Sequence, residues 1–293
     1  MRVLKLYENS EKPVVSFEFF PPRDEEAEKG FGKTIDDLAV MAPDYMSVTF
    51  GAGGSTRDGS YQTVKQLIAD MNLPTVAYIA GYGLGPDEIT AVLDRYRDLG
   101  VETIFVIRGD APRNNNQFTP HPDSLRYASD MLAFIGDRYD FDLGCAAYPE
   151  GHIQAESLEK DIEYLKLKVD NGAGYVVAQY FYDNRYFFKY VEKCRAAGIS
   201  VPIIPGIMPV YSIKLTQMLA KLCGTEITDT LRNGIEGLLG GKKSDVENYG
   251  IDFAVNQCRE LLKNGVAGLH FYTMDRSRSV TKIVNRLHEE NLL

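Results

Sequence analysis

Hydrophobic positions along the chain form two alternating patterns, short continuous apolar runs and longer amphipathic stretches. The short runs are rich in β-branched and aromatic residues, which predicts buried strands. The stretches between them repeat apolar residues at helical spacing, and those at 86–100 and 157–172 have an acidic start and a glycine stop, as helices do. The predicted strands are VVSFEFF (14–20), YMSVTF (45–50), TVAYIAG (75–81), TIFVIRG (103–109), DLGCAAY (142–148), YVVAQYF (175–181), PIIPGIM (202–208) and GLHFYTM (268–274).

Eight strands with intervening helices in 293 residues predict the α/β class and a (β/α)8 TIM barrel. The competing architecture is an open doubly wound sheet, but no GxGxxG follows the first strand. The long segment before the last strand can hold helices at about 211–223, 226–239 and 244–264. We interpret it as extra helices inserted before the last strand, within a single domain over 1–293.

The stretch VVSFEFFPPR (14–23) places one acid, Glu18, between the aromatic residues of the first strand. Alternation along the strand puts Phe17 and Phe19 on one face and Glu18 on the other, which in a barrel is the interior. An ionised carboxylate is costly to bury without a partner. Glu18 therefore either meets a cation or is an acid that holds its proton.

Polar side chains also stand near the carboxyl ends of the other predicted strands, where a TIM barrel carries its active site. Each of them alone is more often a satisfied strand-end residue than a ligand contact. Their convergence on one rim favours a functional site, formed by Ser47, Thr49, Asp110, Tyr148, Gln179, His270 and Tyr272 together with Glu18.

Composition and net charge argue against some classes of partner. The chain is 44% apolar and 25% charged, as soluble globular proteins are. Its net charge of −9 argues against a nucleic-acid partner, and local arginines and lysines can still bind a small anion. The first residues lack the apolar core of a signal peptide, and no apolar run reaches the length of a membrane span. We therefore expect a cytoplasmic protein without a membrane partner.

Cysteine and histidine spacing predicts no metal site. The four cysteines lie far apart without a CxxC pair, and the four histidines lack metal-ligand spacing. Scattered free thiols are typical of a reducing compartment.

Taken in order, nine motifs resemble the methylenetetrahydrofolate reductase family, in its bacterial catalytic-barrel form. SFEFFPPR and RGD, followed by AAYPE and QYFYD, make a specific set, although no single motif would suffice. The resemblance covers nearly the whole chain, through SFEFFPPR (16–23), SVTFGAGGSTRD (47–58), IRGD (107–110), YASD (127–130), AAYPEGH (146–152), LKLKVDNGA (165–173), AQYFYD (178–183), IPGIMPV (204–210) and HFYTMDR (270–276).

The resemblance implies a flavin-dependent barrel that reduces 5,10-methylenetetrahydrofolate to 5-methyltetrahydrofolate. The implied cofactor is FAD, with NADH or NADPH as the electron donor. The resemblance makes Glu18 the general acid and Asp110 a second catalytic residue beside both flavin and folate. Gln179 and Arg276 are implied as further folate-binding residues. The implied cofactor-binding residues are Thr49, Phe50, Ala52, Tyr78, Arg108, Gly109, Asp110, Tyr127, Ala128, Tyr148, His152, Asp161 and Lys168.

The chain departs from the family at positions near this site. Tyr78 stands where the family usually has a histidine near the flavin, and Leu219 stands where an aromatic folate contact is common. The first change keeps open the alternative of a flavin-free nicotinamide-dependent reductase. A barrel subunit of a larger electron-transfer complex is a separate alternative. We also expect a homo-oligomer, with an electron-donating partner subunit as a further possibility.

Overall fold

The computed structural model describes residues 2–22, 25–51, 57–111, 118–238 and 240–293. Within these ranges the strands are all parallel and follow the order β7-β6-β5-β4-β3-β2-β1-β9-β8. Their bounds are β1 (Val14–Phe19), β2 (Tyr45–Val48), β3 (Thr75–Ala80), β4 (Thr103–Ile107), β5 (Asp142–Ala147), β6 (Tyr175–Ala178), β7 (Ile203–Ile204), β8 (Gly206–Ile207) and β9 (Gly268–Tyr272).

The strands β7 and β8 are two halves of one predicted strand, PIIPGIM, which Pro205 divides. The first half pairs with β6 and the second half with β9. The backbone N–H of His270 donates to the carbonyl of Pro205 at 3.1 Å, between the two halves. The strand order therefore closes on itself, which confirms the predicted TIM-type barrel.

Closure brings the backbones of neighbouring strands very close at Gly206. A Cβ atom at this position would lie 2.2 Å from the carbonyl oxygen of Ala178 and 2.5 Å from the Tyr272 ring. Only glycine allows this approach.

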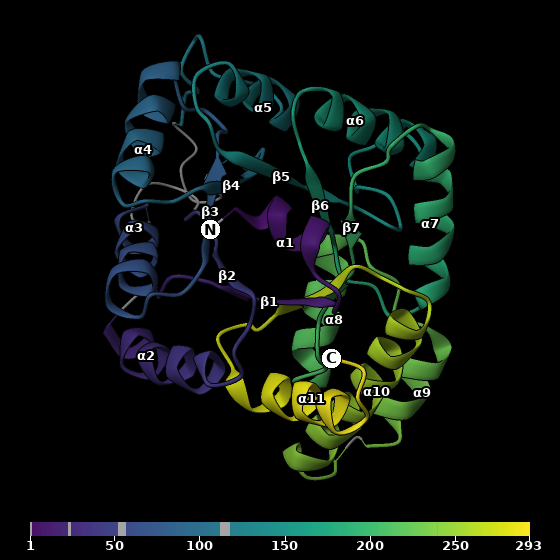
Figure 1. Cartoon of the computed structure of the whole chain (residues 1–293). Coiled ribbons are helices and arrows are strands. Elements are labelled where there is room, and N and C mark those ends of the chain that lie inside the picture. Colours follow the sequence, from purple (N-terminus) through teal and green to yellow (C-terminus); the bar gives the residue numbers. More distant parts are fainter. Residues whose placement is uncertain (1, 23–24, 52–56, 112–117, 239) are drawn as a thin grey trace.

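Helices surround the barrel (Figure 1), and the inserted helices before the last strand are confirmed at α8–α10. The helices α4 and α6 begin and end close to their predicted bounds. The helix bounds are α1 (Val3–Asn9), α2 (Glu25–Ala39), α3 (Arg57–Lys65), η1 (a π-helix, Gln66–Asp70), α4 (Pro86–Asp98), α5 (Ala128–Gly136), α6 (Leu158–Asp170), α7 (Asn184–Ala196), α8 (Ile213–Cys223), α9 (Asp229–Glu236), α10 (Lys243–Lys263) and α11 (Ser277–Glu289).

The short helix α1 covers the amino-terminal end of the barrel and lies inside the ring of outer helices in Figure 1. The backbone N–H of Val3 donates to the Thr103 hydroxyl, and that of Leu4 donates to the Asp142 carboxylate. The Tyr7 hydroxyl lies 2.9 Å from the Tyr45 hydroxyl inside the barrel. Access to the barrel interior is therefore left to the opposite end, where the strands finish.

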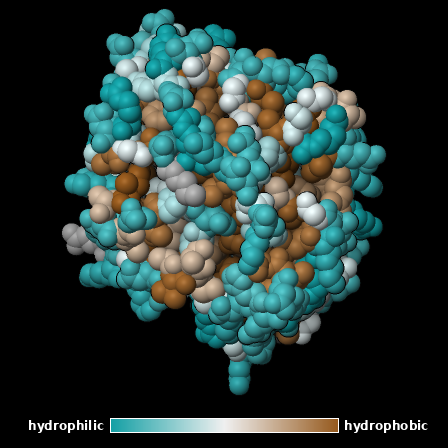
Figure 2. All heavy atoms as spheres, in the orientation of Figure 1, coloured by the Kyte–Doolittle hydropathy of each residue, from teal (hydrophilic) through white to brown (hydrophobic). Residues whose placement is uncertain are grey.

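Two apolar clusters stabilise the molecule. The larger cluster fills the barrel and the space under its helices, and the smaller one lies beneath α8–α10, around Met208, Tyr211, Leu231 and Ile235. On the face shown in Figure 2, hydrophilic residues cover most of the periphery and hydrophobic residues show between them toward the centre. Among the described helices, none is both long and apolar enough to cross a membrane.

Candidate active site

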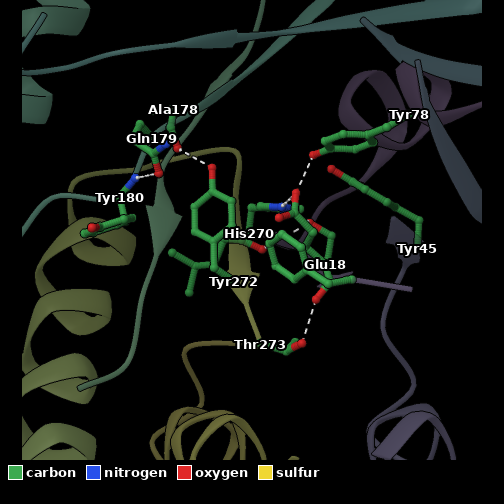
Figure 3. A network of polar contacts seen from close by, with 12 residues as sticks. Glu18, Tyr45, Tyr78, Ala178, Gln179, Tyr180, His270, Tyr272 and Thr273 are labelled. Atoms are coloured by element: carbon green, nitrogen blue, oxygen red, sulfur yellow. Dashed lines mark hydrogen bonds and ion pairs between the residues drawn. The ribbon is translucent and has the colours of Figure 1, made fainter. Parts of the chain in front are cut away.

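Glu18 lies inside the barrel near the end of β1 and is only 3% exposed. The Tyr78 hydroxyl on β3 donates to Glu18 Oε2 at 2.6 Å (Figure 3). His270 Nε2 on β9 lies 3.5 Å from the same oxygen, which is an ion pair only if the imidazole is protonated. Glu18 thus lies on the face of β1 predicted from strand alternation, and its carboxyl group accepts a hydrogen bond from a tyrosine hydroxyl.

The orientation of His270 is set by Ser16, two residues before Glu18 on the same face of β1. His270 Nδ1 lies 2.8 Å from the Ser16 hydroxyl, so its other ring nitrogen points toward Glu18. Ser47 pairs with Glu18 on the neighbouring strand, and among the described residues its buried hydroxyl has no hydrogen-bond partner. A substrate or water molecule beside Glu18 can use that hydroxyl.

The backbone around Glu18 is held by residues just beyond β9. The Thr273 hydroxyl donates to the Glu18 carbonyl at 2.6 Å, and the Phe20 N–H donates to the Asp275 carboxylate at 2.9 Å. Met274 and Asp275 both adopt the left-handed backbone region, with φ of 49° and 53°. Such consecutive positions are costly for non-glycine residues and often occur at functional sites.

Burial raises the pKa of Asp275 to about 6, although its hydrogen bond from Phe20 opposes the shift. The negative charge of Glu18 nearby contributes in the same direction as burial. Asp275 is not among the site residues predicted from the sequence. The signal that could have identified it is an acid directly after the polar end of the last predicted strand.

Arg276 follows Asp275 and is exposed at the barrel rim. Its guanidinium lies over the Tyr211 ring, 5.2 Å from the centroid, and the Tyr211 hydroxyl donates to the carbonyls of Tyr272 and Thr273. The inserted segment before α8 therefore helps to place this cation at the same rim as Glu18.

Gln179 lies at the end of β6, where its side-chain oxygen accepts the backbone N–H of Tyr180 at 3.0 Å (Figure 3). Next to it, the Tyr272 hydroxyl donates to the carbonyl of Ala178. A small cavity of about 10 Å³ also opens here, with Gln179 and Glu150 among its lining residues.

Glu150 is a second acid that the sequence analysis did not assign, although it lies inside the AAYPEGH motif. Burial raises its pKa to about 7, and the backbone N–H of Glu226 donates to its Oε2 at 2.8 Å. Among the described residues its buried Oε1 has no hydrogen-bond partner. Glu150 thus joins the β5–α6 loop to the inserted helices beside Gln179.

A second group of predicted residues gathers along β4, β5 and α6. Arg108 contacts Asp110 at 3.4 Å at the end of β4, and Tyr148 packs edge-on against His152 after β5. Burial lowers the pKa of His152, and the positive charges of Arg108 and Lys168 lower it further. Among the predicted residues, this group brings the cations Arg108 and Lys168 close together around His152.

Within this group Asp161, on the first turn of α6, is buried. Burial raises its pKa, and among the described residues its Oδ2 has no hydrogen-bond partner. Tyr127 before α5 and Tyr164 on α6 are 60% and 50% exposed. A buried acceptor, two cations and exposed rings fit a cofactor that has a polar chain, a diphosphate and a flat ring system.

Most of the remaining residues predicted to bind the cofactor lie at the ends of strands or at the start of a helix. Thr49 and Phe50 follow β2, Gly109 lies in the left-handed turn after β4, and Ala128 begins α5. Ala52 lies outside the described residues. Tyr78 is 5% exposed and its hydroxyl is bonded to Glu18, so the structure brings it together with the acid, and its contact with a cofactor stays a prediction.

Among the described residues there is no group of three or more His, Cys, Asp or Glu side chains that could hold a metal ion. The four cysteines are free thiols.

Comparison with known proteins shows the family of this chain. The family model described as methylenetetrahydrofolate reductase matches residues 2–288. The chain belongs to the methylenetetrahydrofolate reductase family. The 5,10-methylenetetrahydrofolate reductase of Escherichia coli is 33% identical to it over 276 residues, which are 93% of this chain and 90% of that protein.

Eukaryotic members are longer. Methylenetetrahydrofolate reductase 1 of Schizosaccharomyces pombe is 35% identical over 96% of this chain, and methylenetetrahydrofolate reductase (NADH) 1 of Arabidopsis thaliana is 33% identical over 93% of it. The chain spans about half the length of these two relatives, 47% and 48%.

A solved structure from Clostridium thermocellum shares the fold, with a TM-score of 0.69, 18% identity and coverage of 100% of this chain and 99% of that one. It is described as an uncharacterized protein that binds two copies of 5-methyl-5,6,7,8-tetrahydrofolic acid.

Proposed function

We propose that this chain reduces 5,10-methylenetetrahydrofolate to 5-methyltetrahydrofolate, with FAD as its cofactor and NADH or NADPH as its electron donor. Family membership supports the reaction. The observation that carries the proposal is Glu18, a buried acid at the mouth of the barrel with a hydroxyl donor on its carboxyl group.

Glu18 is the proposed general acid. The five-membered ring of the substrate opens only when the departing nitrogen receives a proton, which leaves a reactive iminium carbon. A carboxyl group in an apolar, water-poor site is suited to donating that proton. Glu18 suits this role because it is only 3% exposed and its carboxyl group is held in the barrel interior by the Tyr78 hydroxyl.

FAD, when bound, would supply the hydride for the iminium carbon. Arg108 and Lys168 would hold its anionic diphosphate, and Asp161 would accept hydrogen bonds from its hydroxyl groups. Asp110, exposed at the end of β4, would act beside both cofactor and substrate as the second catalytic residue. The proposed contacts from Tyr127, Tyr148 and His152 would orient the flat ring system.

The folate substrate would lie across the rim between β6 and β9. Gln179 would donate its side-chain amide to the pterin, and Arg276 would hold an anionic part of the folate. The neighbour from Clostridium thermocellum, which binds a methyltetrahydrofolate in the same fold, supports a folate in this barrel. The plant relatives named for NADH support a nicotinamide donor.

The test is Glu18→Gln, which keeps the size of the side chain but removes the transferable proton. Purified protein is first scanned for a visible flavin band, and the reduction of that band by NADH or NADPH is followed by stopped flow. We expect this half-reaction to stay close to wild type in the variant. Oxidation of the reduced enzyme by methylenetetrahydrofolate should slow by about 100-fold or more, the usual scale for loss of a general acid.

Two results would contradict the proposal. A normal rate of the folate half-reaction in Glu18→Gln would make Glu18 a structural acid. Protein that carries no flavin band but still oxidises NADH in the presence of methylenetetrahydrofolate would favour direct transfer from the nicotinamide.

A further inference from the structure

The register of the barrel strands brings Tyr78 to Glu18. Glu18 pairs with Ser47 on β2, and Ser47 pairs with Val76 on β3. Tyr78 is two residues beyond Val76 and therefore lies on the same face of the sheet. Its side chain crosses the barrel interior, and its hydroxyl ends 2.6 Å from Glu18 Oε2 (Figure 3).

The Tyr78 ring has little freedom to leave this position. It stacks on Phe105 of the next strand, with 4.4 Å between the ring centroids and 23° between the planes. The residue is 5% exposed, and its backbone pairs with that of Phe105. A buried, stacked ring holds its hydroxyl in place at a low further cost in entropy.

The hydroxyl of Tyr78 acts as a permanent donor. Burial raises its pKa well above the usual value, and the nearby charge of Glu18 acts in the same direction. It therefore keeps its proton and donates to Glu18 whether that carboxyl is neutral or ionised. By contrast, His270 is 3.5 Å from Glu18, too far for a strong hydrogen bond.

We propose that Tyr78 is a positioning residue for the acid Glu18, because its hydroxyl fixes the carboxyl group in the barrel mouth. This inference rests on the proposed function and goes beyond it. A donor on Oε2 leaves Oε1 as the oxygen that carries the transferable proton.

Several other titratable groups face Glu18 and set its environment along with Tyr78. None of them donates a hydrogen bond to its carboxyl group among the described residues. They are Tyr45 on β2, His270 and Tyr272 on β9, and Asp275 beyond β9.

Tyr175 on β6 offers a matched control. Like Tyr78, it packs its ring against Phe105, with 6.0 Å between the two ring centroids, and the residue is fully buried. Among the described residues its hydroxyl has no hydrogen-bond partner. Tyr175→Phe therefore removes a buried hydroxyl from the same barrel without touching Glu18.

The first experiment measures kcat and KM for methylenetetrahydrofolate reduction in the holoenzyme and both variants. In Tyr78→Phe we expect kcat to fall about tenfold while KM stays close to wild type, because the acid is less well placed for the reacting substrate. Tyr175→Phe should keep the wild-type values of both.

The second experiment does not depend on turnover. The infrared carboxyl band of Glu18, assigned by its loss in Glu18→Gln, is recorded in each protein under the same conditions. In Tyr78→Phe the band should change frequency, because the carboxyl group loses a hydrogen bond, and in Tyr175→Phe it should not. Catalytically active wild type together with an unchanged kcat and an unmoved band in Tyr78→Phe would overturn this inference alone. Wild type that reduces no methylenetetrahydrofolate would overturn the proposed function instead.

Discussion

At the level of single residues, the rim of this barrel places three carboxyl groups in different surroundings. Glu18 is deeply buried with a hydroxyl donor, Glu150 is half-buried on the β5–α6 loop against the inserted segment, and Asp275 holds the backbone beyond β1. Burial raises the pKa of Glu150 to about 7 and that of Asp275 to about 6. Because the surroundings of these carboxyl groups differ, one site can contain both a proton donor and an ionised group.

Asp275 has a consequence for stability that can be measured. Because its pKa rises from 3.8 to about 6, the folded state binds its proton more tightly than the unfolded chain does. The stability that it contributes is fully present below about pH 4 and is lost as the pH rises through 6. At 1.36 kcal/mol per unit, the loss amounts to at most about 3 kcal/mol.

Asp275→Asn removes this titration and keeps an oxygen that can accept the Phe20 N–H. The free energy of unfolding in urea, measured for both proteins from pH 4 to 8, should therefore shift in favour of the variant as the pH rises. A difference between the two proteins that stays constant across this range would show that Asp275 does not titrate as described.

At the level of secondary-structure elements, the divided strand β7–β8 is the place where the barrel closes. Pro205 supplies no N–H, so the strand changes partner there, from β6 to β9. Gly206 follows directly and packs its backbone against Ala178 and Tyr272. Ala178 directly precedes Gln179, so barrel closure and the proposed folate-binding side of the rim depend on one another.

Gly206→Ala should destabilise the barrel. The new Cβ meets a backbone carbonyl at 2.2 Å, which cannot move as a flexible side chain could, and overpacking of this kind costs about 1–3 kcal/mol or more. Gly30→Ala is the control, because Gly30 is exposed on α2 with no atom within 4 Å of its added Cβ. That variant should gain about 0.5–1 kcal/mol. Urea midpoints check both, and an unchanged midpoint for Gly206→Ala would contradict the close approach.

At the level of the whole molecule, the site lies between two apolar clusters. Glu18 and Tyr78 belong to the barrel, while Arg276 rests on Tyr211, which is part of the smaller cluster beneath α8–α10. The two clusters can therefore respond separately to mutation, and the proposed folate-binding rim contacts both.

Leu231→Ala tests this division. Leu231 is fully buried in the smaller cluster, so its truncation should cost about 2–5 kcal/mol there. Hydrogen exchange should become faster in α8–α10 and stay slow in β3–β5, and the KM for folate should rise. Leu93→Ala, equally buried on α4 in the barrel cluster, should instead affect the barrel. Equal acceleration of exchange in the strands of Leu231→Ala would mean that the clusters unfold as one.

The local pattern of residues was sufficient for the alternation of strands and helices and for the face of β1 that carries Glu18, but not for α1. Helices α4 and α6 carry their own stop signals, and α8–α10 were predicted from helical periodicity. Alternation along β1 required only neighbouring residues, because side chains on a strand point to opposite faces by geometry. The same local information could not show that Pro205 divides a strand between two partners, since that depends on which strands meet when the barrel closes.

Contacts between distant residues needed the folded chain. Tyr78 donates to Glu18 across 60 positions and Asp275 accepts from Phe20 across 255, and both contacts exist only because strand register and barrel closure place them together. Glu150 likewise meets Glu226, 76 positions further along, in the connection between α8 and α9. A sequence motif specifies which groups are present, but distances and burial between separate strands arise from the packing of the whole barrel.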